Sequence, residues 1–242
     1  MSTIVDSLPS ILADDDAGST AVSTRVGEPY AGSTESPLSA FATAQVRGLI
    51  RQVFVPGWPR PSRQVVFSAV DSEADVLPVC MQVGRALAEE TSQAVCVVST
   101  TSSRQEEREM VGSRPPYPAM QNRYGMLRDS SVQLAPTLWS MSRPAFAGPE
   151  GTSAIRAGAR LAELGLEFEY TILQAAPVSA DSSAVLLGRL CGGLVLVLEA
   201  NTTRRVAAQK TKQMLSAAGV RLLGAVLIGR TFPVPESIYK RL

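Results

Sequence analysis

The chain has 242 residues, of which 45% are hydrophobic, so it can bury a core and is not disordered throughout. Its 23 basic and 22 acidic residues give a net charge of +1, which excludes nucleic-acid or membrane binding driven by bulk charge. The absence of histidine excludes Ser-His-Asp and Cys-His hydrolase chemistry and histidine-ligated metals.

The sequence favours a cytoplasmic protein. No stretch reaches the roughly 18 consecutive apolar residues that span a bilayer, and residues 1–12 lack the basic cluster and apolar core of a secretory signal. Cys80, Cys96 and Cys191 lie far apart within apolar runs. That pattern is typical of buried thiols in a reducing compartment, and not of a disulfide framework or a zinc site.

Residues 1–35 are rich in Ser, Thr, Ala, Asp and Gly without a sustained period, so we expect a disordered tail before one domain at 36–242. Ser36 suits an N-cap and Pro37 the first turn of a helix that ends before Gly57. Hydrophobic periodicity then predicts alternating elements: strand 65–68, helix 76–88, strand 94–98, weak strand 138–141, helix 155–164 and strand 170–173. The polar residues 101–130 predict a long loop or a partly helical insertion.

The last third has the clearest pattern. A helix at 183–190 precedes a buried strand at 193–198, and a second buried strand follows at 222–228. Between them, Asn201 or Thr202 is expected to cap a helix that runs to Ala218 and stops at Gly219. Uniformly apolar strands alternating with helices predict an α/β fold with a doubly wound, mostly parallel sheet and helices on both faces.

Three stretches in order carry a resemblance to one family. Residues 168–184 and 190–205 are similar to "FDYVIIDTPPV…D" and "ADGVVLVVRAGVTRR", and residues 214–227 are similar to "LEAAGVRVLGVVLN". These motifs resemble the cytoplasmic ATPase domain of bacterial tyrosine kinases of exopolysaccharide and capsule synthesis, relatives of the MinD and ParA ATPases. The resemblance covers roughly residues 38–242, and it implies a P-loop NTPase-like fold of the SIMIBI type.

The resemblance places the family's phosphate-binding motif, "PGEGKS", at residues 70–78. Such a loop needs glycines for close backbone approach to phosphate, a lysine for its charge and a hydroxyl for Mg²⁺. The corresponding segment has no glycine and no basic residue. Carboxylates there would repel a polyphosphate. The degenerate phosphate-loop positions are Asp71, Ser72, Glu73, Ala74, Asp75 and Val76.

The remaining nucleotide contacts of the family are also replaced. Ser99 stands where the resemblance places the first Asp of a second metal motif, and Gln174 where it places a Walker B-like Asp. Neither can supply an anionic Mg²⁺ ligand. Ile228 stands where an Asn would read adenine. We therefore expect no catalytic residues, no metal and no bound ATP or Mg²⁺.

Other charged residues have a functional and an ordinary interpretation. Arg47 and Arg51 lie one helical turn apart, where the family's N-terminal helix contacts a neighbouring subunit; otherwise they form a solvated face. Asp181 matches a family Asp but suits an N-cap of the following helix. A basic face on the last helix is either solvated or a contact for anionic lipid or a partner; it comprises Arg204, Arg205, Lys210 and Lys212.

The resemblance leads to a first hypothesis of a non-catalytic regulator or scaffold in exopolysaccharide or capsule synthesis. Its partner would be a membrane polysaccharide copolymerase or a kinase paralogue at the inner face of the membrane, with a homo-oligomer left open and no nucleic acid. A second hypothesis is an atypical ATPase or tyrosine kinase that binds ATP and Mg²⁺ through other groups, such as Arg104 or Arg108. A third is a MinD/ParA-like positioning protein without its switch. The resemblance implies a tyrosine-rich C-terminal tail as the substrate of such kinases. Here Tyr239 is a single tyrosine and not a cluster, so autophosphorylation is not expected.

Overall fold

A computed structural model describes residues 37–55, 62–71, 74–101, 127–147 and 154–229. Its strands are β1 (Gln64–Ala69), β2 (Val95–Ser99), β3 (Val132–Ala135), β4 (Leu138–Met141), β5 (Tyr170–Gln174), β6 (Leu194–Glu199) and β7 (Leu222–Ile228). Its helices are α1 (Pro37–Val53), α2 (Leu77–Thr91), the 3-10 turn η1 (Leu127–Ser130), α4 (Arg143–Ala147), α5 (Ala154–Glu167), α6 (Ser183–Leu190) and α7 (Arg205–Ala217).

These strands form one seven-stranded sheet in the order β3-β4-β2-β5-β1-β6-β7. β1 is central and pairs in parallel with β5 and β6, and every other pairing except β3 with β4 is parallel as well. The chain leaves β1 through α2 toward one edge of the sheet and later returns through β5 and α6 to the other. The predicted α/β, doubly wound, mostly parallel sheet is confirmed.

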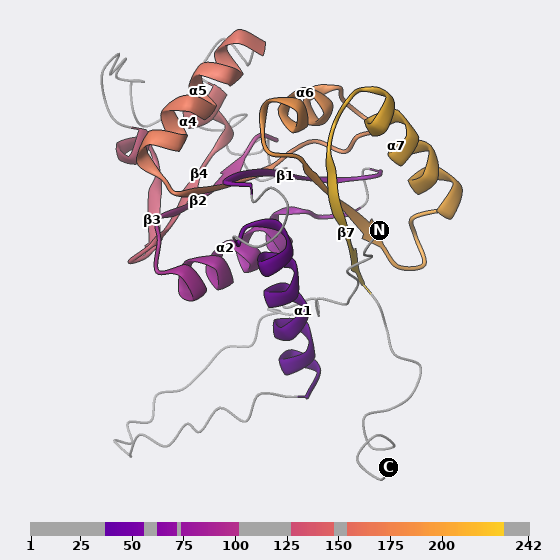
Figure 1. The fold of residues 1–242 in the computed structure, drawn as a ribbon, viewed down its shortest axis with the longest axis horizontal. Helices are drawn as coiled ribbons and strands as arrows, with labels where there is room; N and C mark the ends of the chain where they lie inside the picture. Colours follow the sequence, from indigo (N-terminus) through magenta and orange to yellow (C-terminus); the bar gives the residue numbers. More distant parts are fainter. Residues whose placement is uncertain (1–36, 56–61, 72–73, 102–126, 148–153, 230–242) are drawn as a thin grey trace, which may run out of the picture.

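Helices cover both faces of the sheet (Figure 1). α1 and α2 lie on one face, where Ile50, Phe67 and Leu87 belong to the same buried cluster. α4, α5, α6 and α7 lie on the other, where Leu161 and Leu215 belong to a second cluster. β1 is buried at five of its six positions, as expected for a strand covered on both sides. Within the part of the chain that the structure describes, no helix is long and apolar enough to span a membrane.

Three details differ from the expectations. β3 was not predicted; it is an antiparallel edge strand whose residues are mostly exposed, so it has no run of buried apolar side chains. β7 was predicted to be a buried strand, but of its residues only Val226 is buried, because this strand forms the opposite edge of the sheet. Neither Asn201 nor Thr202 caps α7. Asn201 adopts a left-handed turn conformation with φ of 65°, and the N-cap position is Arg204, without a side-chain capping bond.

Several expectations lie outside the described residues. They concern the tail at 1–35, most of the segment at 101–130, and the residues Ser72, Glu73, Arg104, Arg108 and Tyr239.

Candidate functional site

The loop between β1 and α2 ends in a hydrogen bond between the Asp75 carboxylate and the first turn of α2. Asp75 Oδ1 accepts a hydrogen bond of 3.1 Å from the backbone N–H of Leu77, the first residue of α2. Pro78 follows and has no N–H to donate. The first N–H groups of a helix form a natural anion site, because they lack partners within the helix and lie at its positive end. Here one of these donors is bound by Asp75 and the next is absent.

The apolar residues of the same loop are part of the core. Ala74 and Val76 are buried in the cluster that also holds Val79 and Ile50. Asp71 lies at the start of the loop, and its Oδ1 is buried without a hydrogen-bond partner in the structure. The described part of the loop therefore presents carboxylates and buried apolar side chains.

The two residues at the predicted metal positions lie side by side. Ser99 and Gln174 are register partners in β2 and β5. Ser99 Oγ donates to Gln174 Oε1 at 2.8 Å, and Gln174 Nε2 donates to Thr101 Oγ1 at 2.7 Å. The Gln174 backbone carbonyl accepts bonds of 2.9 Å from both the N–H and the hydroxyl of Thr100. The result is a neutral network at the carboxyl ends of two parallel strands.

The other sequence candidates lie away from this network. Ile228 is the last residue of β7 and pairs with Glu199 across the edge of the sheet. Arg47 and Arg51 are exposed on α1, and Arg51 Nε lies 3.2 Å from Glu90 Oε1 of α2. The four basic residues Arg204, Arg205, Lys210 and Lys212 are exposed on and beside α7.

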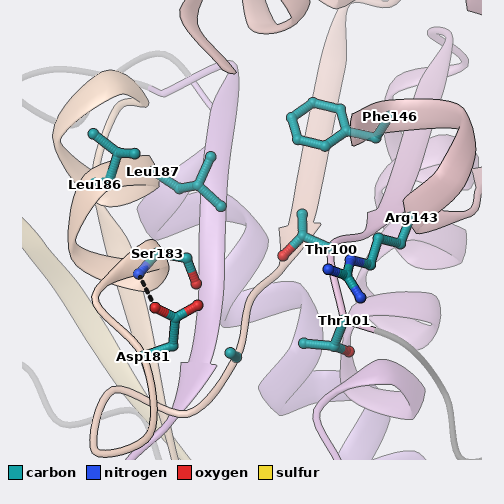
Figure 2. Close-up of a pocket in the computed structure, with 9 residues that line it drawn as sticks. Thr100, Thr101, Arg143, Phe146, Asp181, Ser183, Leu186 and Leu187 are labelled. Atoms are coloured by element: carbon teal, nitrogen blue, oxygen red, sulfur yellow. Dashed lines mark hydrogen bonds between the residues drawn. The ribbon is translucent and has the colours of Figure 1, made fainter. Parts of the chain in front are cut away.

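A pocket of about 290 Å³ opens beside the neutral network, between α4 and α6. Figure 2 shows Arg143 lying beside Thr100 and Thr101, with Asp181 on the opposite wall. Apolar side chains line the rest of the pocket: Phe146, Leu186 and Leu187. A cavity with a few polar groups and an apolar wall at the carboxyl ends of parallel strands is the usual place for a ligand in this fold class.

Asp181 carries the negative charge of this pocket. Its Oδ1 accepts a bond of 3.2 Å from the backbone N–H of Ser183, so it caps α6 from the residue before the N-cap position, Ser182. Hydrogen bonds from the Ser183 hydroxyl and N–H lower the pKa of Asp181 below its usual value of 3.8. The carboxylate is thus ionised at neutral pH, and the expectation of a capping role is consistent with its geometry.

Sequence reasoning missed Arg143 and Phe146 of the pocket. They lie on the five-residue helix α4, which is too short to produce a periodic pattern. Thr100 and Thr101 could have been found, since they directly follow a predicted parallel strand, the position where ligand-binding residues gather.

The described residues contain no group of three or more His, Cys, Asp or Glu side chains close enough together to hold a metal.

Trp139 packs against other side chains. Its ring centroid lies 5.5 Å from that of Phe168, and the Arg128 guanidinium carbon lies 4.7 Å from the Trp139 ring centroid. Trp139 is therefore a packing aromatic.

Solved structures with the same fold are of two kinds. The chimerical protein CapA2B2 is 18% identical with a TM-score of 0.61, covering 83% of this chain and 88% of its own. The kinase domain of the Escherichia coli tyrosine kinase ETK is 14% identical with a TM-score of 0.51, covering 82% and 79%. A ParA family ATPase from Chlorobium tepidum TLS is 14% identical with a TM-score of 0.51, covering 70% and 74%.

This chain has the fold of bacterial tyrosine kinase domains and ParA-type ATPases. Neither a scan of protein-family models nor a comparison with curated protein sequences gives a match. In a P-loop fold the phosphate-binding loop connects a parallel strand to the helix that follows it in the chain. In this chain that connection is the loop from β1 to α2, which carries Asp71 and Asp75.

Proposed function

We propose that this protein is a non-catalytic relative of the tyrosine kinases of exopolysaccharide and capsule synthesis. It acts by binding, as a regulator or scaffold for a membrane polysaccharide copolymerase or for a catalytic kinase paralogue. The proposal combines the kinase-like fold with the replacement of the residues that such kinases use to hold a magnesium-bound nucleotide.

The neutral network of Ser99, Thr101 and Gln174 is the observation that carries the proposal. A magnesium-bound triphosphate needs anionic oxygen ligands and cationic groups around its phosphates. At this place the chain has hydroxyls and an amide that already satisfy one another at 2.7–3.0 Å. The bond from Leu77 to Asp75 adds to this support, because it puts a carboxylate where a phosphate would otherwise accept.

Isothermal titration calorimetry of the full chain with Mg-ATP and with Mg-ADP tests the loss of nucleotide binding. We expect no heat of binding at nucleotide concentrations up to the millimolar range. Dissociation constants in the micromolar range for either nucleotide would contradict the proposal. A thermal unfolding curve of the same sample serves as the control for folded protein.

The partner is tested separately, with the copolymerase or kinase paralogue encoded nearest to this gene. We expect the two proteins to co-purify. Reversing both α1 arginines (Arg47→Glu, Arg51→Glu) weakens the complex if α1 forms the contact, whereas the exposed α7 variant Val206→Glu serves as the matched control. Failure to co-purify with every such neighbour would remove the scaffold role while leaving the nucleotide result intact.

A second candidate function is an atypical ATPase or kinase, and the pocket favours it. Arg143 and the ionised Asp181 both line that pocket, and such charged groups can orient a substrate. Phosphate release from ATP that is abolished by Arg143→Ala would establish this function. Absence of release across several divalent metals and lipid conditions would exclude it.

A further inference from the structure

Helix α5 has two apolar faces, and only one of them is used inside the chain. Ala157, Leu161 and Leu164 are buried against the sheet. Ile155 and Leu166, at the two ends of the opposite face, are each 88% exposed. A helix at the surface of a globular protein normally has a single apolar face and a polar one. The second apolar face of α5 is therefore the feature that needs a partner.

The exposed face has the spacing of a helix–helix seam. The residues on it are separated by four, three and four positions, which is the a/d spacing of a coiled coil. They are Ile155, Ala159, Ala162 and Leu166, all of them exposed. The large side chains lie at the ends of the seam and the small ones at its centre. This order reads the same in both directions along the helix.

We propose that α5 pairs with α5 of a second copy of this chain, antiparallel and across a two-fold axis. In that arrangement Ile155 of each copy packs on Leu166 of the other, and Ala159 packs on Ala162. A two-fold interface uses the same patch on both subunits, so the patch must be complementary to itself. The seam satisfies that requirement because its order of large and small residues is the same in both directions along the helix. The inference does not depend on the proposed function.

The charges beside the seam are self-complementary as well. Arg156 and Glu163 occupy equivalent flanking positions, seven residues apart on the same side of the seam. In an antiparallel pair such positions face each other, so Arg156 of one copy meets Glu163 of the other, twice per dimer. Both residues also interact within their own chain, Glu163 with Arg160 at 2.9 Å, but an exposed pair of this kind contributes little and can be exchanged.

Glycines occupy the other side of the seam. A Cβ placed on Gly158 would have no atom within 4 Å, so the backbone of α5 is uncovered there. Gly165 stands at the equivalent position one heptad later, where a Cβ would lie 3.4 Å from the Gln64 side-chain amide. The small residues at position 158 and at the central alanines let two helix backbones approach closely. The seam from 155 to 166 is only about 16 Å long at 1.5 Å per residue, so we expect a weak dimer that forms at raised concentration.

Disulfide trapping tests the geometry directly. One sample carries Ile155→Cys, the other carries Leu166→Cys and a mass tag, and both carry Cys191→Ser; the remaining Cys80 and Cys96 are buried. An antiparallel pair brings position 155 of one copy to 166 of the other, while like positions stay about 16 Å apart, beyond disulfide reach. We expect the mixed disulfide at least tenfold above either homodisulfide. Equal yields of all three would overturn the proposal.

Sedimentation of the full chain over a concentration series tests the energetics. We expect Leu166→Lys to weaken self-association at least tenfold, and Val206→Lys, at a residue 75% exposed on α7, to leave it unchanged. Arg156→Glu and Glu163→Arg alone should each weaken it several-fold, and the two together should restore it to within about twofold. A chain that stays monomeric to several hundred micromolar, or a dimer indifferent to Leu166→Lys, would refute the α5 pairing.

Discussion

Ser99 Oγ lies 2.8 Å from Gln174 Oε1, across a register pair of β2 and β5 at the carboxyl end of the sheet. A carboxylate at either position would be anionic. The serine and glutamine make a neutral contact in a partly buried place. This pair therefore stabilises the folded chain, and its removal should lower the free energy of unfolding.

Gln174→Ala should lower the free energy of unfolding by about 2 kcal/mol, because it leaves the Ser99 and Thr101 hydroxyls without their partner in a partly buried place. Denaturant unfolding measures the change. Gln209→Ala, at an exposed position of α7, is the matched control and should have almost no effect. Equal stabilities of the two variants would mean that the network contributes nothing.

Asp75→Ala should destabilise the protein by about 1 kcal/mol, since the N–H of Leu77 loses its acceptor and the positive end of α2 loses a carboxylate. Glu89→Ala removes an exposed carboxylate from the far half of the same helix and should change stability by less. The difference in unfolding midpoint between these variants reports the capping contribution. No difference would show that water replaces the carboxylate at no cost.

Two glycines of similar helical conformation should respond in opposite directions. A Cβ on Gly84 would lie 2.6 Å from Val97 Cγ2, so Gly84→Ala should cost about 1–3 kcal/mol through overpacking of α2 on β2. A Cβ on Gly48 of α1 meets nothing within 4 Å, so Gly48→Ala should stabilise by up to about 1 kcal/mol through helix propensity. Thermal unfolding of both variants decides the matter, and a stabilised Gly84→Ala would show that the α2–β2 contact is loose.

The three thiols should be unreactive in the folded chain. Burial raises the pKa of Cys96 and of Cys191 from 9.0 to about 12 and that of Cys80 further still. A thiol reagent at pH 8 should therefore label native protein on the order of tenfold or more slowly than unfolded protein, with the partly buried Cys191 reacting first. Rapid labelling of Cys80 or Cys96 would contradict the packing described for β2 and α2.

The same pKa shifts predict a loss of stability in alkali. The folded chain keeps its thiols protonated to higher pH than the unfolded chain, whose thiols ionise near 9.0. Their contribution is complete below about pH 9 and declines as the pH rises toward 12. Denaturation curves between pH 8 and 11 should show this decline, and Cys96→Ala should reduce its slope. A slope unchanged by that substitution would assign the alkaline effect to other groups.

Arg51 should matter little for folding despite its ion pair. Its side chain is 70% exposed where it meets Glu90, so Arg51→Ala should change stability by less than about 0.5 kcal/mol. Ile50, its neighbour on α1, is fully buried, and Ile50→Ala should cost about 2–5 kcal/mol. The contrast is measured by denaturant unfolding. A large effect of Arg51→Ala would make this pair a structural tie between α1 and α2 and weaken its interpretation as a partner contact.

The sheet could largely be predicted from the sequence because five of its strands are short, continuous apolar runs. Strands such as β1 and β6 are buried on both faces, and only apolar residues satisfy that environment. The edges could not be predicted as well. β3 is exposed and alternates weakly, while β7 has an apolar sequence although its position at the edge leaves most of it partly exposed. The position of a strand in the sheet decides how exposed it is, and the sequence of a single strand does not determine that position.

The candidate site was predictable only in part. The resemblance pointed to Ser99 and Gln174, and the fold brings them into hydrogen-bond contact. The pocket, by contrast, combines Thr101 after β2, Arg143 on the short α4 and Asp181 before α6. These residues come from three segments that no local pattern connects. Only the three-dimensional arrangement of parallel strand ends unites them.

The side chain of Asp75 occupies the N-terminal end of α2, where a bound phosphate would otherwise lie. A nucleotide-binding protein gains stability from its ligand in proportion to the logarithm of ligand concentration, so its folded population follows the cellular supply of that ligand. The Asp75 carboxylate is covalently tethered beside the N–H of Leu77, and its local concentration is fixed. If the proposal of lost nucleotide binding holds, the stability of the folded chain does not change with nucleotide concentration.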